Sequence, residues 1–110
     1  MAIPHAQSGQ IVSVRPLGDR LLEATSTAIL KAGQLEVMRV VLPPGKSLRE
    51  HQTRGEATVQ CLEGTVEFVS EGHAQQLHPG DFVHLAPRAL HTLKAIQHAS
   101  LLVTICLQPG

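Results

Sequence analysis

The chain has 110 residues, a length that fits one domain with a single core. Nine Lys and Arg residues balance nine Asp and Glu residues, and no basic block or aromatic stacking platform occurs, so the composition argues against a nucleic-acid binder. The longest apolar run is far shorter than the roughly 20 residues of a membrane-spanning helix. The N-terminus lacks the basic and apolar regions of a secretory signal. We therefore expect a cytoplasmic protein that binds neither nucleic acid nor membranes.

The chain begins with residues 1–10, which are polar and aperiodic and are predicted to form a disordered tail, followed by one domain over residues 11–108. Glycine and proline recur at short intervals, and the runs between them are rich in Val, Ile, Leu and Thr, which is typical of short strands. A short helix is expected near residues 17–24. The expected strands are 11–15, 27–31, 35–42, 57–62, 65–70, 74–77, 81–85, 91–95 and 100–107.

Two tight hairpins are predicted, at Glu63-Gly64 and at Glu71-Gly72, because glycine supplies the positive backbone angle of such turns. The spacing leaves no room for βαβ units, so the sheets must be antiparallel. The fold class is therefore all-β, a sandwich or barrel.

The core must be aliphatic, because the chain has no Trp or Tyr and only two Phe residues. Two-residue alternation predicts that the interior includes Val59, Cys61, Val66, Phe68, Val83 and Leu85. Cys61 and Cys106 each stand inside an apolar segment, and we interpret both as inert core thiols.

The segment 45–64 resembles the first sequence motif of the cupin superfamily, G(X)5HXH(X)3,4E(X)6G. Gly45 and His51 match at the family distance, and Gly64 matches the closing glycine. Thr53 stands in place of the second histidine and Ala57 in place of the glutamate. The resemblance therefore implies the cupin motif with part of its ligand set missing.

The segment 80–95 resembles the second cupin motif, G(X)5PXG(X)2H(X)3N. Gly80 and His91 match, while Ala86, Arg88 and Ala95 replace the proline, glycine and asparagine. The resemblance implies a single-domain antiparallel jelly-roll β-barrel, the double-stranded β-helix of small cupin proteins. Members of the family often hold one metal ion.

A metal site is implied by the resemblance at His51 and His91, for one divalent ion such as Zn, Ni, Mn or Fe. We expect the two histidines to face one another across the barrel cavity. Two imidazoles hold such an ion loosely, because a catalytic site generally needs three protein ligands. His84 and Glu56 are the weaker candidates for a further ligand. Strand alternation argues against Glu56, because Ala57 then faces inward and Glu56 outward unless a bulge intervenes.

The ligand cavity is predicted to be lined by Thr53, Ala57, Val59, Cys61 and Arg88. If Arg88 converges with Arg49 and Arg54 at the mouth of the barrel, a small carboxylate becomes a plausible ligand. Solvated surface arginines are the alternative.

Three functions remain open on the sequence. The first is a barrel that binds a small molecule and, weakly, a divalent metal. The second is a metal-dependent enzyme of dioxygenase or isomerase type that uses His51, His91 and a further ligand. The third is a regulatory or structural dimer without catalysis. A homodimer is expected in any case, because residues 11–15 and 101–107 offer more apolar surface than one small barrel covers.

Overall fold

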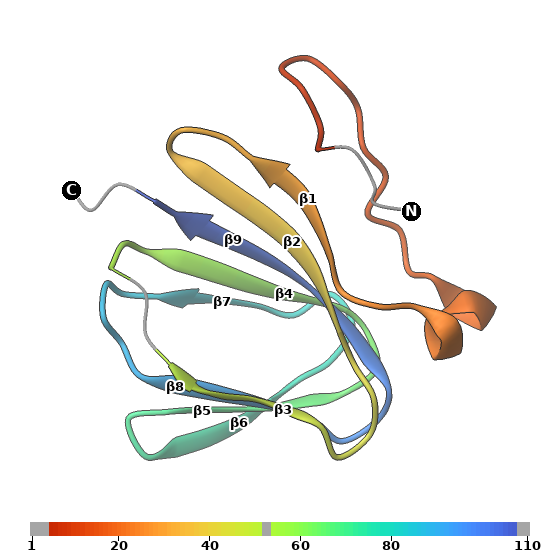
Figure 1. Cartoon of the computed structure of the whole chain (residues 1–110). Helices are drawn as coiled ribbons and strands as arrows, with labels where there is room; N and C mark the ends of the chain where they lie inside the picture. Colours follow the sequence, from red (N-terminus) through yellow and green to blue (C-terminus); the bar gives the residue numbers. More distant parts are fainter. Residues whose placement is uncertain (1–4, 52–53, 108–110) are drawn as a thin grey trace.

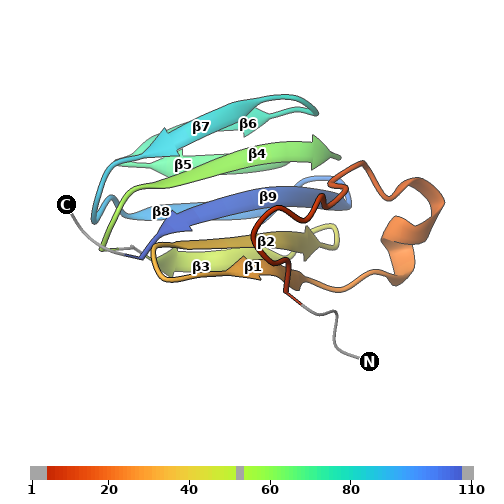
Figure 2. The same cartoon turned by 90° about the horizontal axis from the view of Figure 1, so that it is seen from above.

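The computed structural model describes residues 5–51 and 54–107, without the side chains of residues 49–51. Two antiparallel sheets face each other, as Figures 1 and 2 show. One sheet has the strand order β1-β2-β9-β4-β7 and the other the order β3-β8-β5-β6. The predicted all-β jelly-roll architecture is confirmed. The elements are η1 (Gly18–Glu23), β1 (Thr27–Lys31), β2 (Leu35–Leu42), β3 (Ser47–His51), β4 (Ala57–Glu63), β5 (Val66–Ser70), β6 (His73–Leu77), β7 (Phe82–Leu85), β8 (His91–Ala95) and β9 (Ala99–Cys106).

The strand expected at residues 11–15 is wrong, because this segment has no strand pairing. All the other expected strands are present, and the short helix appears as the 3-10 helix η1. Strand β3 was not expected, since Leu48 is the only apolar residue in Ser47–His51. Its strand conformation comes instead from backbone pairing with β8.

The turn at Glu71-Gly72 closes the β5–β6 hairpin as predicted, with both residues at positive φ and with Ser70 paired to His73. The hairpin predicted at Glu63-Gly64 is wrong, because β4 and β5 belong to different sheets. Gly64 is nevertheless required there. Its φ is +82°, and a Cβ at this position would lie 2.2 Å from the carbonyl oxygen of His98.

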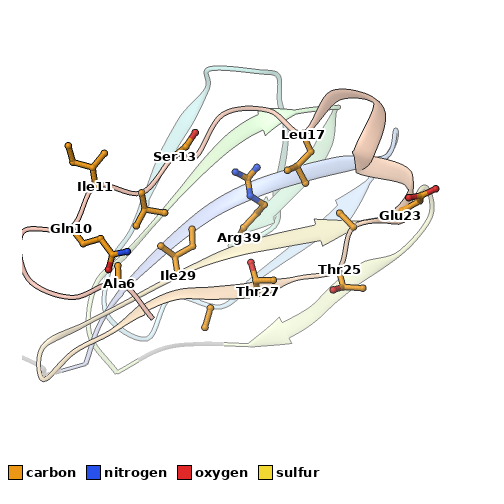
Figure 3. A pocket seen from close by; sticks show the side chains of 13 residues that line it. Ala6, Gln10, Ile11, Ser13, Leu17, Glu23, Thr25, Thr27, Ile29 and Arg39 are labelled. Atoms are coloured by element: carbon orange, nitrogen blue, oxygen red, sulfur yellow. The ribbon is translucent and has the colours of Figure 1, made fainter. Parts of the chain in front are cut away.

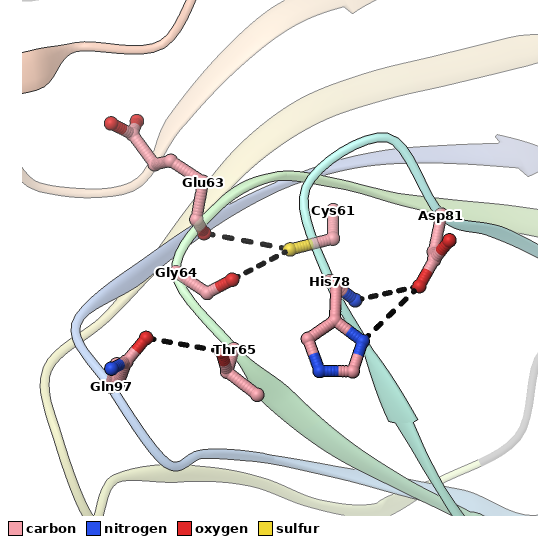
Figure 4. Close-up of polar contacts among 7 residues, drawn as sticks. All are labelled: Cys61, Glu63, Gly64, Thr65, His78, Asp81 and Gln97. Atoms are coloured by element: carbon pink, nitrogen blue, oxygen red, sulfur yellow. Dashed lines mark hydrogen bonds and ion pairs between the residues drawn. The ribbon is translucent and has the colours of Figure 1, made fainter.

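The core lies between the two sheets and is aliphatic, as the composition predicts. Five of the six residues expected inside are buried, and the sixth, Val83, packs against the core from a half-buried position. Cys61 is fully buried, and its thiol donates to the carbonyl oxygens of Glu63 and Gly64, each at 3.5 Å (Figure 4). Burial, as the largest cause, raises the pKa of this thiol. Cys61 is therefore an inert core residue beside the β4–β5 turn.

The N-terminal arm, residues 5–17, passes over the outer face of the five-stranded sheet (Figure 2). The Ala6 N–H donates to the carbonyl oxygen of Ile29 on β1 at 2.8 Å, so the described part of the predicted tail contacts the domain. Residues 1–4 lie outside the described residues. No helix in the described part of the chain is long and apolar enough to cross a membrane.

The carboxylate of Glu63 fixes the other end of the arm. It accepts hydrogen bonds from the N–H groups of Leu17 at 2.9 Å and Gly18 at 3.1 Å, and from the Ser100 hydroxyl at 2.5 Å. Burial of Glu63 acts to raise its pKa, but the Leu17, Ser100 and Gly18 bonds and the charge of Arg39 outweigh it, so the pKa lies below its ordinary value. Glu63 therefore holds the arm to the barrel in its ionised form.

Candidate functional site

A small cavity of about 160 Å³ lies between the two sheets. Its walls come from β2, β3, β4, β7, β8 and β9, so both sheets contribute to it. Of the ten described side chains that line it, nine are apolar and the tenth is His91. The lining residues are Met38, Val40, Leu48, Ala57, Val59, Leu85, His91, Leu93, Val103 and Ile105. We call this space the barrel cavity.

His91 is the polar group of the barrel cavity. It opens β8, and only 4% of the residue is exposed. Its Nδ1 lies 3.2 Å from the carbonyl oxygen of Ala89, and its ring centroid lies 6.5 Å from that of Phe68. A proton on Nδ1 satisfies the Ala89 carbonyl, which makes Nε2 the acceptor atom of the ring. The imidazole is thus held in one orientation by the loop before β8.

His51 lies beside His91 in the backbone rather than opposite it. The two residues are register partners on the neighbouring strands β3 and β8, so the expectation that they stand on opposite walls of the cavity is wrong. The side chain of His51 and the whole of Thr53 lie outside the described residues. The use of His51 as a ligand therefore stays a prediction.

Glu56 and His84 lie on the outer face of the five-stranded sheet, away from the barrel cavity. The Nε2 of His84 is 2.5 Å from Oε2 of Glu56, and 53% and 63% of these two side chains are exposed. Their neighbours Ala57 and Leu85 are buried and line the cavity. Because side chains alternate along a strand, the inward position of Ala57 and Leu85 directs Glu56 and His84 outward.

The residues predicted to line a ligand cavity separate into two groups. Ala57 and Val59 line the barrel cavity. Cys61 does not line this cavity and lies in the core beside the β4–β5 turn. Arg88 is exposed in the loop before β8, where its φ is +63°. Arg54 is also exposed, so the described arginines at the mouth do not enter the cavity.

The sequence reasoning missed the β2 and β9 walls, which are formed by Met38, Val40, Val103 and Ile105. Both strands are rich in apolar residues, but neither alternates cleanly, since Val37 and Met38 are adjacent in β2 and 101–103 is an unbroken apolar run in β9. Such runs do not identify which face of a strand lines a cavity.

The described residues do not fit a three-ligand metal centre. They contain no group of three or more His, Cys, Asp or Glu side chains placed to hold an ion. At the motif position of the glutamate, the Ala57 side chain presents a methyl group to the cavity. In the described part of the chain, His91 is the imidazole at this position, and His51 would add a second as a prediction; a catalytic site generally has three protein ligands.

Comparison with known proteins gives concordant results. A family model for the cupin domain matches residues 38–106. A quercetin 2,3-dioxygenase of Bacillus subtilis is 31% identical over 117 aligned positions, which cover 99% of this chain but only 32% of that enzyme. The chain thus spans about a third of the length of this relative.

Solved structures resemble the whole fold. A cupin superfamily protein from Desulfitobacterium hafniense superimposes with a TM-score of 0.78 and 16% identity, over 94% of this chain and all of the other. A conserved protein of unknown function from Streptococcus pyogenes gives a TM-score of 0.74 and 16% identity, over all of this chain and 96% of the other. At such low identity these likenesses establish the fold alone.

Proposed function

Because the chain belongs to the cupin family, we propose that it is a small-molecule-binding barrel whose ligand lies in the barrel cavity beside His91. One observation carries this proposal: among the side chains that the structure describes, the buried imidazole of His91 stands in a cavity whose other lining residues are apolar. Ligand sites are typically hydrophobic, with a small number of placed polar groups that orient the ligand. The barrel cavity has that composition.

The size of the cavity limits the ligand. About 160 Å³ is close to the volume of engineered apolar cavities that bind benzene, and below the 300 to 1,000 Å³ usual for drug-sized ligands. The ligand class is therefore a small, mostly apolar molecule with one group that can hydrogen-bond to the imidazole.

Phenol and benzene test this proposal as a matched pair of probes, because they differ by one hydroxyl. We expect the wild-type protein to bind phenol about tenfold more tightly than benzene, as one buried hydrogen bond contributes roughly 1.4 kcal/mol. The variant His91→Leu should lose this preference and keep the affinity for benzene. His84→Leu, which changes an exposed histidine on the outer face, is the control. Equal binding of both probes to the wild type would refute the role of His91.

A metal-dependent reaction is the second candidate, favoured by the 31% identity to a quercetin 2,3-dioxygenase over nearly the whole chain. The donor set described above does not complete a three-ligand site, so we derive no reaction step through a metal. Elemental analysis after purification without chelator or affinity tag separates the two candidates. A stoichiometric transition metal favours the enzyme, and a metal-free protein favours the binding barrel.

We also propose a cytoplasmic homodimer. In the apolar run 101–107, β9 lies between β2 and β4 and its residues Leu101 and Val103 face the core, so only part of the run is available for a contact. The exposed Ile11 and Val12 of the N-terminal arm remain as apolar surface for a contact. Sedimentation at micromolar concentration tests this assembly, and a stable monomer would contradict it.

A further inference from the structure

A second, larger cavity lies between the N-terminal arm and the outer face of β1 and β2 (Figure 3). Its volume is about 690 Å³, within the range of small-molecule sites. Met38 and Val40 of β2 face the barrel cavity, whereas Arg39 between them lines this second one. The two cavities are therefore on opposite faces of the same sheet. We call the second one the arm cavity.

Arg39 is a buried cation whose donors are incompletely used. Only 7% of the residue is exposed, and its Nη1 has no hydrogen-bond acceptor anywhere in residues 5–51 and 54–107. A guanidinium stays charged at any physiological pH, and leaving its N–H donors buried without acceptors costs free energy. An acceptor that enters the arm cavity would remove this cost.

Glu63 compensates the charge of Arg39 only through space. Among the described residues, Arg39 and Glu63 form no ion pair within 4 Å. Burial acts to raise the pKa of Glu63 and its hydrogen bonds lower it, and the charge of Arg39 adds a smaller lowering effect. The Glu63 oxygens already accept from Leu17, Gly18 and Ser100. The Nη1 group therefore needs another acceptor, and the partial compensation favours a single negative charge over a dianion.

The walls of the arm cavity combine apolar and hydroxyl-bearing side chains. Figure 3 shows Leu17 and Ile29 on either side of the Arg39 guanidinium, with Ser13 and Thr27 nearby. Glu23, the carboxylate in the lining, stands at the far end and points away from Arg39 in the same view. The cavity thus offers a cationic centre beside apolar side chains, within walls that also carry hydroxyl groups.

We propose that the arm cavity binds a small free monocarboxylate with an apolar body. The carboxylate lies on the Arg39 guanidinium, whose planar fork can donate two parallel hydrogen bonds to it. The apolar body packs against Leu17 of the arm and Ile29 of β1. This site is separate from the barrel cavity, so it stands or falls independently of the function proposed there.

Octanoate and 1-octanol test the proposal, since they share a chain length and differ in headgroup charge. Titration followed by amide NMR shifts should give octanoate an affinity at least about tenfold higher than 1-octanol, because a charge-assisted bidentate pair is roughly twice as strong as a neutral hydrogen bond. The shifts should concentrate at Leu17, Thr27 and Ile29. Equal affinities, or shifts concentrated at His91 and Leu93, would overturn the proposal.

Variants of Arg39 identify the recognising group. Arg39→Met should reduce octanoate affinity at least about tenfold and leave that of 1-octanol unchanged, whereas Lys94→Met, an exposed cation on β8, should change neither. If Arg39→Met does not fold, Arg39→Lys keeps the charge without the fork and should still weaken octanoate binding. Full octanoate affinity in either Arg39 variant would overturn the assignment.

A second copy of the chain is the competing occupant of this face. Sedimentation in the presence of octanoate distinguishes it from a free ligand. We expect octanoate to leave the sedimentation coefficient unchanged while it binds. Dissociation of a dimer by octanoate would mean that the partner copy supplies the acceptor for Arg39, and would overturn the proposal.

Discussion

Replacing Glu63 by glutamine tests how strongly the N-terminal arm is tied to the barrel. The Glu63 carboxylate accepts three hydrogen bonds, two of them through Oε2 and one through Oε1. In Glu63→Gln the amide oxygen can keep the two bonds at Oε2, but the amide nitrogen then meets the Gly18 N–H donor to donor. A hydrogen bond to a charged group contributes about 1.5 to 3 kcal/mol, and the two remaining bonds lose their ionic character. We expect the free energy of unfolding to fall by about 2 to 3 kcal/mol.

The pH dependence of stability should differ between the wild type and Glu63→Gln. Because the folded-state pKa of Glu63 is lowered, its ionised form stabilises the fold above the ordinary glutamate pKa, about 4.3. That contribution is lost as the pH falls through the lower, folded-state pKa. Wild-type stability should therefore decline over this acidic window, and Glu63→Gln should decline less.

Urea unfolding followed by far-ultraviolet circular dichroism is the suitable assay, since the chain has no Trp or Tyr to report by fluorescence. Glu67→Gln on β5 makes the same change of charge and is the control. If Glu63→Gln and Glu67→Gln unfold at the same urea concentration at pH 7, the tie between the arm and the barrel does not contribute to stability.

Three further predictions follow from turns, metal ligands and assembly. Gly64→Ala should destabilise the fold by more than about 3 kcal/mol, because the new Cβ clashes with backbone atoms at a position of positive φ. Gly72→Ala, which has a φ of +81° and open space around it, should cost about 1 kcal/mol in chemical denaturation. Equal costs would contradict the close approach at Gly64. Zinc, nickel or manganese titrated into the protein should bind weakly. The metal affinity should fall further as the pH drops from about 7 to 6. Binding should be abolished by His51→Ala or His91→Ala and unaffected by Glu56→Gln; metal binding that survives loss of both histidines would refute the assignment. Sedimentation equilibrium should give a dimer mass at micromolar concentration, and a monomer mass would exclude the proposed assembly.

The sheets were predictable where a strand carries its own apolar pattern. Strands β1, β2 and β8 have the expected bounds. In β8 an alternating burial pattern marks the strand, whereas β1 and β2 are marked by apolar, β-branched runs between polar turns. Strand β3 was not predictable in this way, since its polar segment becomes a strand through pairing with β8. The segment 11–15 has a strand-like composition but lies in the arm, where exposed Ile11 finds no partner strand in the described residues.

The candidate site was predictable only in part. The spacing of Gly80 and His91 led to the imidazole that lines the barrel cavity among the described residues. The outward direction of His84 follows from strand alternation once Val83 and Leu85 are predicted to lie inside, and the structure agrees. Arg39 was not predictable as a site residue. The arm that covers it, residues 5–17, lies 22 to 34 residues earlier in the chain, and no local pattern encodes that contact.

The most direct test of the central claim is to locate bound phenol by intermolecular nuclear Overhauser effects to methyl groups. The proposed function predicts contacts from the phenol ring to the methyl groups of Val59, Leu93 and Val103, which line the barrel cavity. Contacts only to methyl groups outside this cavity, or no contacts at saturating phenol, would contradict the claim that the barrel binds a small molecule beside His91.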